Sequence, residues 1–76
     1  MPSAAISRIV YEPEMQTLNI WFRETGELYR YYDVPPRVYD AFRKAMSKGQ
    51  FFNRHIKDRY PFQHMSGDPD NGRHAA

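Results

Sequence analysis

The sequence predicts a small α+β fold, in which a three-stranded antiparallel β-meander is followed by two short helices that pack on the sheet. Three observations favour this class. The N-terminal half holds three short runs of β-branched and aromatic residues, separated by turn residues. The pair Pro35-Pro36 then ends the extended part of the chain. After it, apolar residues recur at helical spacing, and strands followed by helices are typical of the α+β class.

The predicted strands are residues 6–11, 18–23 and 28–33. In the second run the apolar members of the alternation are Leu18, Ile20 and Phe22. They lie on one face, so Asn19, Trp21 and Arg23 lie on the other. Short connections between successive strands predict antiparallel neighbours, with Gly26 suited to a positive φ in the second turn.

The third strand leaves one question open. Tyr29 and Tyr31 share a face opposite Leu28, Arg30 and Tyr32, but a register shift of one residue would exchange the faces. Tyr29 and Tyr31 therefore face either the core or the outside, and a core this small needs such bulky rings.

The first helix is predicted over residues 37–46, after Pro36 in the first turn. Its apolar stripe consists of Val38, Ala41, Phe42, Ala45 and Met46. A second helix is predicted from about Lys48 to Asp58, with Ser47 as its N-cap and Gln50 completing a capping box. We expect one domain over residues 3–62 and a disordered tail over the polar residues 63–76.

Composition excludes several classes of protein. The 76 residues contain no cysteine, which excludes disulfides and thiolate metal sites. No apolar run reaches the length of a membrane span, and no signal peptide is recognisable, so we expect a cytoplasmic protein without a membrane partner. The net charge of +2 is uneven: residues 1–36 carry three arginines against five carboxylates, whereas residues 37–60 carry seven basic against two acidic side chains. That asymmetry favours a polyanionic partner, although a solvated helix surface has the same pattern.

The sequence contains no recognisable catalytic motif. No nucleophile motif, phosphate-binding glycine loop or paired carboxylate arrangement occurs. The three histidines, at positions 55, 64 and 74, are spread too widely for a metal-binding pair. We therefore expect no enzyme, no cofactor, no metal and no small-molecule substrate.

The chain resembles the KTSC domain family over roughly residues 3–62. The resemblance rests on Ile9-Val10-Tyr11, Leu18-x-Ile20-x-Phe22, Tyr29-Arg30-Tyr31, Val34-Pro35 with Val38-Tyr39, and the segment Ser47-x-Gly49-x-Phe51-Phe52-Asn53-x-x-Ile56. The family is named for its occurrence at the C-terminus of some lysyl-tRNA synthetases. The resemblance implies a stand-alone bacterial form of a domain that has no assigned function, for which RNA binding has been proposed.

Two functions fit these features. The first is a sequence-tolerant module that binds RNA or single-stranded DNA, in which aromatic rings stack on bases and cations contact phosphates in one continuous patch. Its candidate residues are Trp21, Arg23, Arg30, Tyr32, Arg43, Lys44, Lys48, Arg54 and Lys57. The second is a protein-interaction or assembly domain, because exposed Trp, Tyr and Arg also mark protein interfaces and small domains gain stability as homodimers or higher homo-oligomers.

Overall fold

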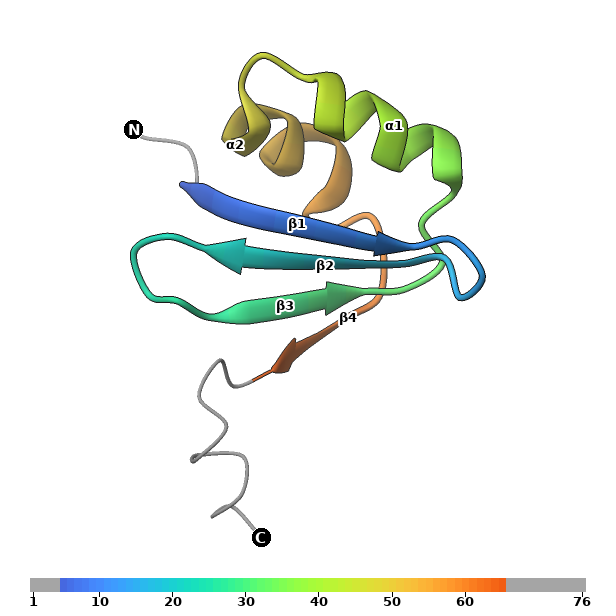
Figure 1. Cartoon of the computed structure of the whole chain (residues 1–76), viewed down its shortest axis with the longest axis horizontal. Coiled ribbons are helices and arrows are strands. Elements are labelled where there is room, and N and C mark those ends of the chain that lie inside the picture. The colour runs from blue at the N-terminus through green and yellow to red at the C-terminus, as the bar shows by residue number, and fades with distance from the viewer. Residues whose placement is uncertain (1–4, 66–76) are drawn as a thin grey trace, which may run out of the picture.

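The computed structural model describes residues 5–65, in which one four-stranded antiparallel sheet has helical segments on one side (Figure 1). The strands follow one another across the sheet in sequence order: β1 (Ile6–Glu12), β2 (Thr17–Phe22), β3 (Leu28–Tyr31) and β4 (Phe62–Met65). The α+β class and the antiparallel meander are confirmed. The expected number of three strands is wrong, because β4 pairs with β3 as a fourth strand.

The local sequence does not reveal β4. Its residues, Phe62-Gln63-His64-Met65, lack the β-branched side chains that mark a strand. Pairing with β3 creates the strand instead, with Tyr29 opposite His64 and Tyr31 opposite Phe62. The strand occupies the start of the segment that the sequence assigns to the tail. Residues 66–76 lie outside the described residues, so the disordered tail stays a prediction.

The register divides the sheet into two faces. Residues directly opposite one another in a ladder share a face. The face that packs against the helices carries Ile9, Tyr11, Leu18, Ile20, Tyr29 and Tyr31. Leu18 and Ile20 are completely buried, as the alternation in β2 predicts. Tyr31 is 3% exposed and Tyr29 is partly buried, so both tyrosines belong to the core face.

The hairpin between β2 and β3 depends on one glycine. Gly26 has a φ of +72°, and its N–H donates to the carbonyl oxygen of Phe22 over 2.8 Å. A residue with a Cβ is strained in this conformation, so the positive φ predicted for Gly26 has a steric basis.

Helix α1 (Pro36–Lys44) begins as predicted, with a proline in its first turn. It ends two residues earlier than expected, because Ala45 takes an extended conformation with a ψ of 141°. Phe42 is completely buried, whereas Met46 of the predicted stripe lies beyond the helix and is fully exposed. Phe42 is therefore the residue of the predicted apolar stripe that α1 buries completely in the core.

The second predicted helix consists of two segments, α2 (Lys48–Phe51) and the π-helical η1 (Phe52–Ile56). Ser47 is the N-cap as predicted, and its Oγ accepts the backbone N–H of Gln50 over 3.2 Å. The Lys57 N–H bonds to the carbonyl oxygen of Phe52, five residues back. Phe52 and Ile56, four residues apart, are both buried, so this segment still turns one face to the core although its turn is wider than that of an α-helix.

The core lies between the sheet and the helical segments. Its buried hydrophobic members are Leu18, Ile20, Tyr31, Val34, Phe42, Phe52 and Ile56. Tyr11 connects β1 to α1 by stacking on Tyr39, with ring centroids 4.6 Å apart. Within residues 5–65, none of the helices has the length and apolar character needed to cross a lipid bilayer.

Candidate nucleic-acid interface

The face of the sheet turned away from the helices is the candidate interface, and we call it the open face. Cross-strand pairing brings Arg8 of β1 opposite Trp21 of β2, and Asn19 of β2 opposite Arg30 of β3. These residues alternate with Leu18, Ile20 and Tyr29 of the core face, so their side chains lie on the other side of the sheet.

Arg8 and Trp21 form a cation–π pair on the open face. The Arg8 Cζ atom lies 5.1 Å from the centroid of the Trp21 ring. Such a pair contributes about 0.5–1 kcal/mol at an exposed site. Its geometry places a positive charge over a flat ring, and single strands contact aromatic rings through their bases and cations through their phosphates. Arg8 is not among the residues predicted from the sequence, because its position opposite Trp21 follows from the irregular register between Ile6 and Arg8.

Asn19 fixes the position of Arg30. The Arg30 Nε–H donates to Asn19 Oδ1 over 2.8 Å, and Asn19 is 3% exposed. The Asn19 Nδ2 group donates to the carbonyl oxygen of Val10 over 3.2 Å and to Glu12 Oε2 over 3.3 Å. One buried amide therefore connects β1, β2 and β3, and it holds the guanidinium group in a defined place on the open face.

Tyr32 and Arg23 complete this group of candidates. Tyr32 follows β3, and its hydroxyl donates to Gln63 Oε1 over 2.9 Å. Arg23 is exposed in the turn after β2, and its backbone N–H donates to the carbonyl oxygen of Ala5. The β2 and β3 candidates of the sequence analysis thus lie on the open face or at its end.

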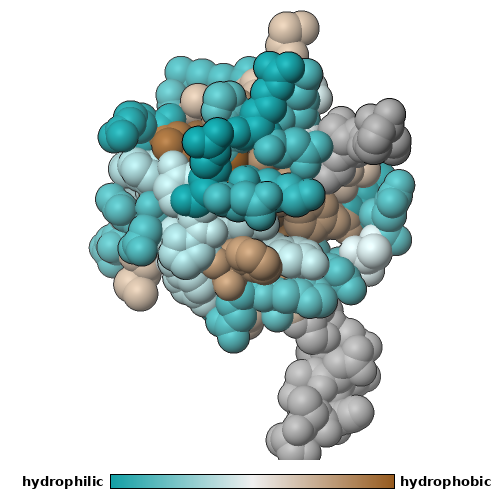
Figure 2. Space-filling view, turned by 180° about the vertical axis from the view of Figure 1, so that it is seen from behind, coloured by the Kyte–Doolittle hydropathy of each residue, from teal (hydrophilic) through white to brown (hydrophobic). Residues whose placement is uncertain are grey.

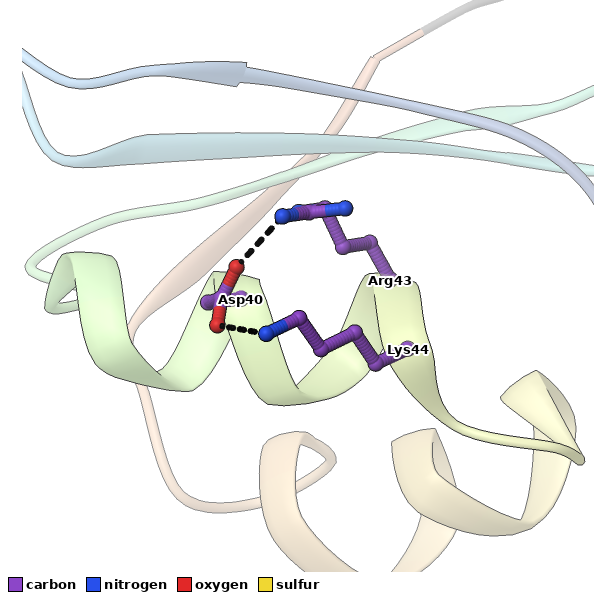
Figure 3. Close-up of polar contacts among 3 residues, drawn as sticks. All are labelled: Asp40, Arg43 and Lys44. Carbon is purple, nitrogen blue, oxygen red and sulfur yellow. Dashed lines mark ion pairs between the residues drawn. The ribbon is translucent and has the colours of Figure 1, made fainter.

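Two other predicted phosphate contacts are ion-paired along α1 (Figure 3). Arg43 and Lys44 both reach back to Asp40, at 2.8 and 3.0 Å from its carboxylate oxygens. The hydrogen bond from Lys44, followed by the charges of both cations, lowers the pKa of Asp40. Exposed pairs of this kind stabilise the helix only slightly, but they neutralise part of the charge available to a phosphate.

The remaining candidates also lie on the helical side. Lys48 donates through Nζ to the carbonyl oxygen of Ala45 over 3.3 Å. Arg54 is exposed on η1, and Lys57 is exposed at the end of η1, beside Asp58. The expectation of one continuous patch is therefore wrong: the open face carries Trp21, Arg30 and Tyr32, and the helical side carries Arg43, Lys44, Lys48, Arg54 and Lys57. The physical reason is that the helices cover the Leu18–Ile20 face, which is opposite the Trp21 face.

Comparisons with known proteins agree with this architecture. A family model described as the KTSC domain matches residues 2–60. A crystal structure of a KTSC domain protein from Yersinia pestis superimposes with a TM-score of 0.78 and 38% sequence identity. The match covers 87% of this chain and 92% of that one.

Similar sequences occur in two contexts. A lysine–tRNA ligase of Nostoc punctiforme is 41% identical over 63 residues, which are 83% of this chain and 11% of the ligase. The chain therefore spans about a tenth of that relative. A protein of Stutzerimonas stutzeri is 38% identical over 60 residues, which are 79% of this chain and 83% of that protein.

Proposed function

The chain belongs to the KTSC domain family, and we propose that it is a binding module for single-stranded nucleic acid, RNA above all, that uses the open face of its sheet. The observation that supports the proposal most is the Arg8–Trp21 pair beside the anchored Arg30. Trp21 and Tyr32 would stack on bases, and Arg8, Arg23 and Arg30 would contact phosphates. The open face thereby takes over the role that the sequence assigns to one patch of residues from the sheet and the helices.

The relatives support RNA as the polyanion. Domains similar to this chain form a small part of proteins named lysine–tRNA ligase, and that name includes an RNA. The sequence leads us to expect a cytoplasmic location, where the module would encounter RNA. We propose binding only, without catalysis.

The geometry sets the expected strength and salt dependence of binding. Stacking of one base on an aromatic ring contributes about 1–3 kcal/mol. Three arginines that each neutralise one phosphate of a single strand give a slope of log K against log salt of about −2. Glu12 lies on the same face beside Asn19 and reduces the net positive charge. We therefore expect weak binding without base specificity, because these contacts do not read base edges.

A homo-oligomeric assembly domain is the alternative. Figure 2 shows the molecule from the side opposite to that of Figure 1. On this face the hydrophobic residues form separate areas among hydrophilic ones. Obligate interfaces are as hydrophobic as the core of a domain, and therefore more hydrophobic than the face in that view. Phe62 is nevertheless 51% exposed on the edge strand β4, which leaves self-association through that edge as the competing outcome.

The intrinsic fluorescence of Trp21 tests the proposal directly, because it is the only tryptophan and lies on the open face. A single-stranded oligouridylate is titrated into the full chain at several salt concentrations, with light scattering of the free protein alongside. We expect quenching of Trp21, together with binding that weakens as salt rises. Light scattering that shows a stable dimer, together with unchanged fluorescence, would support the assembly domain instead.

Charge-matched variants locate the contact surface. Arg8→Ala and Arg30→Ala each remove one positive charge from the open face, and Arg54→Ala removes one from the helical side. We expect the open-face variants to reduce the salt slope by about 0.7 each. Arg54→Ala is expected to leave the slope within error of the original chain. Equal losses in all three variants would mean that only the overall charge matters, and the proposed surface would be wrong.

A further inference from the structure

An aromatic groove lies on the helical side of the sheet, away from the open face. It has a volume of about 440 Å³ and lies between the β2–β3 hairpin, β3, the start of β4 and the end of η1. Its aromatic lining consists of Phe22, Tyr29, Tyr31, Phe52 and Phe62. The volume falls within the usual range for small-molecule sites.

The rings of the groove stand at several angles to one another. Phe22 meets Tyr29 at 90° and Phe52 at 72°, with ring centroids 5.3 Å apart in both pairs. Phe62 lies across Tyr31, with centroids 5.3 Å apart and an angle of 30° between the rings. Rings from β2, β3, β4 and η1 therefore line one hollow at different angles, which is the arrangement of an aromatic cage.

The charged residues of the lining are mostly acidic. Among residues 5–65, Glu24, Glu27 and Asp58 line the groove together with one cation, Lys57. Burial raises the pKa of Tyr31 to about 12, so its hydroxyl is neutral near pH 7, and the charge of Asp58 adds to that increase. The carboxylate of Glu27 lies 3.2 Å from His64 Nε2, beside the stacked Tyr29 and His64 rings, and this contact reduces its contribution relative to those of Glu24 and Asp58. The field in the groove thus favours cations and opposes phosphates.

We propose that this groove binds a free organic cation, an ammonium group carried on an apolar or aromatic body. The ring faces attract the positive charge, and the carboxylates at the rim neutralise it. The body of the ligand would replace water against Phe52 and Phe62. The proposal does not depend on nucleic-acid binding, because the two sites lie on opposite faces of the sheet.

The test uses a cation and an uncharged compound of similar shape. Phenyltrimethylammonium is titrated into the full isotope-labelled chain and followed by amide NMR shifts, and tert-butylphenol serves as the uncharged probe. We expect shifts at groove residues, none at the Trp21 indole, and binding of the cation at least about tenfold tighter than binding of the neutral probe. Equal binding of the two probes would overturn the proposal.

Three variants separate the groove from general charge effects. Asp58→Asn removes a rim carboxylate while keeping a residue that tolerates the φ of 65° at this position. We expect it to weaken binding of phenyltrimethylammonium severalfold, and Lys57→Ala to strengthen it. Asp40→Asn removes a carboxylate from α1, outside the groove, and is expected to leave the affinity unchanged. Equal weakening by Asp40→Asn and Asp58→Asn would overturn the proposal.

Phe62→Ala tests the aromatic wall. Because Phe62 is 51% exposed, its removal is expected to leave the amide spectrum dispersed while binding of the cation falls severalfold. A folded Phe62→Ala variant that binds the cation as well as the original chain would count against the aromatic cage. Trp21 fluorescence with oligouridylate reports separately on the open face, so failure at one site is distinguishable from failure at the other.

Discussion

Arg30 on β3 is held by Asn19 on β2 through a hydrogen bond of 2.8 Å from Nε to Oδ1. Asn19 is 3% exposed, and its Nδ2 group bonds to β1 at Val10 and Glu12. A single amide in the middle strand therefore links three strands and orients the guanidinium of the open face. Stability and the proposed binding surface depend on the same residue.

Asn19→Ala is expected to lower the free energy of unfolding by about 1–3 kcal/mol, because it leaves polar groups in β1 and β3 without their partner. Urea unfolding followed by circular dichroism measures the loss. The same variant is expected to weaken oligouridylate binding, since Arg30 is no longer oriented. Asn53→Ala, at an exposed position of η1, is the matched control and is expected to change stability by less than about 0.5 kcal/mol. Equal stability of the two variants would show that the Asn19 hydrogen bonds contribute nothing.

The stacked pair of Tyr11 and Tyr39 connects the edge strand β1 to α1, with centroids 4.6 Å apart and an angle of 8° between the rings. A double-mutant cycle with Tyr11→Leu and Tyr39→Leu is expected to give a coupling free energy of about 0.5–1.5 kcal/mol. Tyr11→Phe keeps the stack but removes the hydroxyl, which donates to the carbonyl oxygen of Val34 over 2.6 Å. That variant is expected to lose about 1 kcal/mol by itself. A coupling energy of zero would mean that the rings only fill space.

The parts of the fold that follow from local pattern could be predicted from the sequence. The alternation in β2 separates Leu18 and Ile20 from Asn19 and Trp21, and the ladder confirms this division. The proline in the first turn of α1 and the Ser47 cap are also local signals. These features depend on neighbours within a few residues, which the sequence displays directly.

Features that depend on distant pairing could not be predicted. The strand β4 exists because it pairs with β3, more than thirty residues earlier in the chain, and Phe62 is the one strand-favouring residue in its own composition. The candidate site was only partly predictable for the same reason. Arg8 reaches Trp21 through the register between β1 and β2, whereas Arg43 and Lys44 are positioned by α1 on the other side of the sheet. Residue type was enough to identify candidate nucleic-acid contacts. Which of them share one face of the sheet depends on the face that the helices cover.

Phe52 and Phe62 are both aromatic neighbours of Tyr31, but they differ in burial, at 5% and 51% exposed. Phe52→Ala opens a cavity in the core and is expected to cost about 3–5 kcal/mol. That is comparable to the net stability of a domain of this size, so cooperative unfolding is expected to disappear. Phe62→Ala is expected to cost only about 1 kcal/mol, because the residue is already 51% exposed. Thermal unfolding followed by circular dichroism compares the two, and a cooperative transition in Phe52→Ala would contradict this view of the core.

Ionisation of Tyr31 makes the free energy of unfolding depend on pH in alkaline solution. Its pKa is raised from 10.0 to about 12 in the folded chain, by burial first and then by the charges of Tyr29 and Asp58. Below about pH 10 the phenol is neutral in both states, and its full contribution to stability is present. Between about pH 10 and pH 12 the unfolded chain loses the proton while the folded chain keeps it, so the free energy of unfolding falls as pH rises.

A shift of this size corresponds to about 2–3 kcal/mol. Tyr31→Phe keeps the ring in the core and removes the ionisation, so this variant is expected to lose less stability than the original chain over that interval. Urea unfolding at about pH 9 and about pH 12 measures the difference, with phenolate absorbance reporting ionisation. Burial also raises the pKa of Tyr11, so Tyr31→Phe keeps some alkaline sensitivity and only the difference between the two chains is diagnostic. Parallel loss of stability in both chains would show that the Tyr31 hydroxyl is not desolvated in the fold.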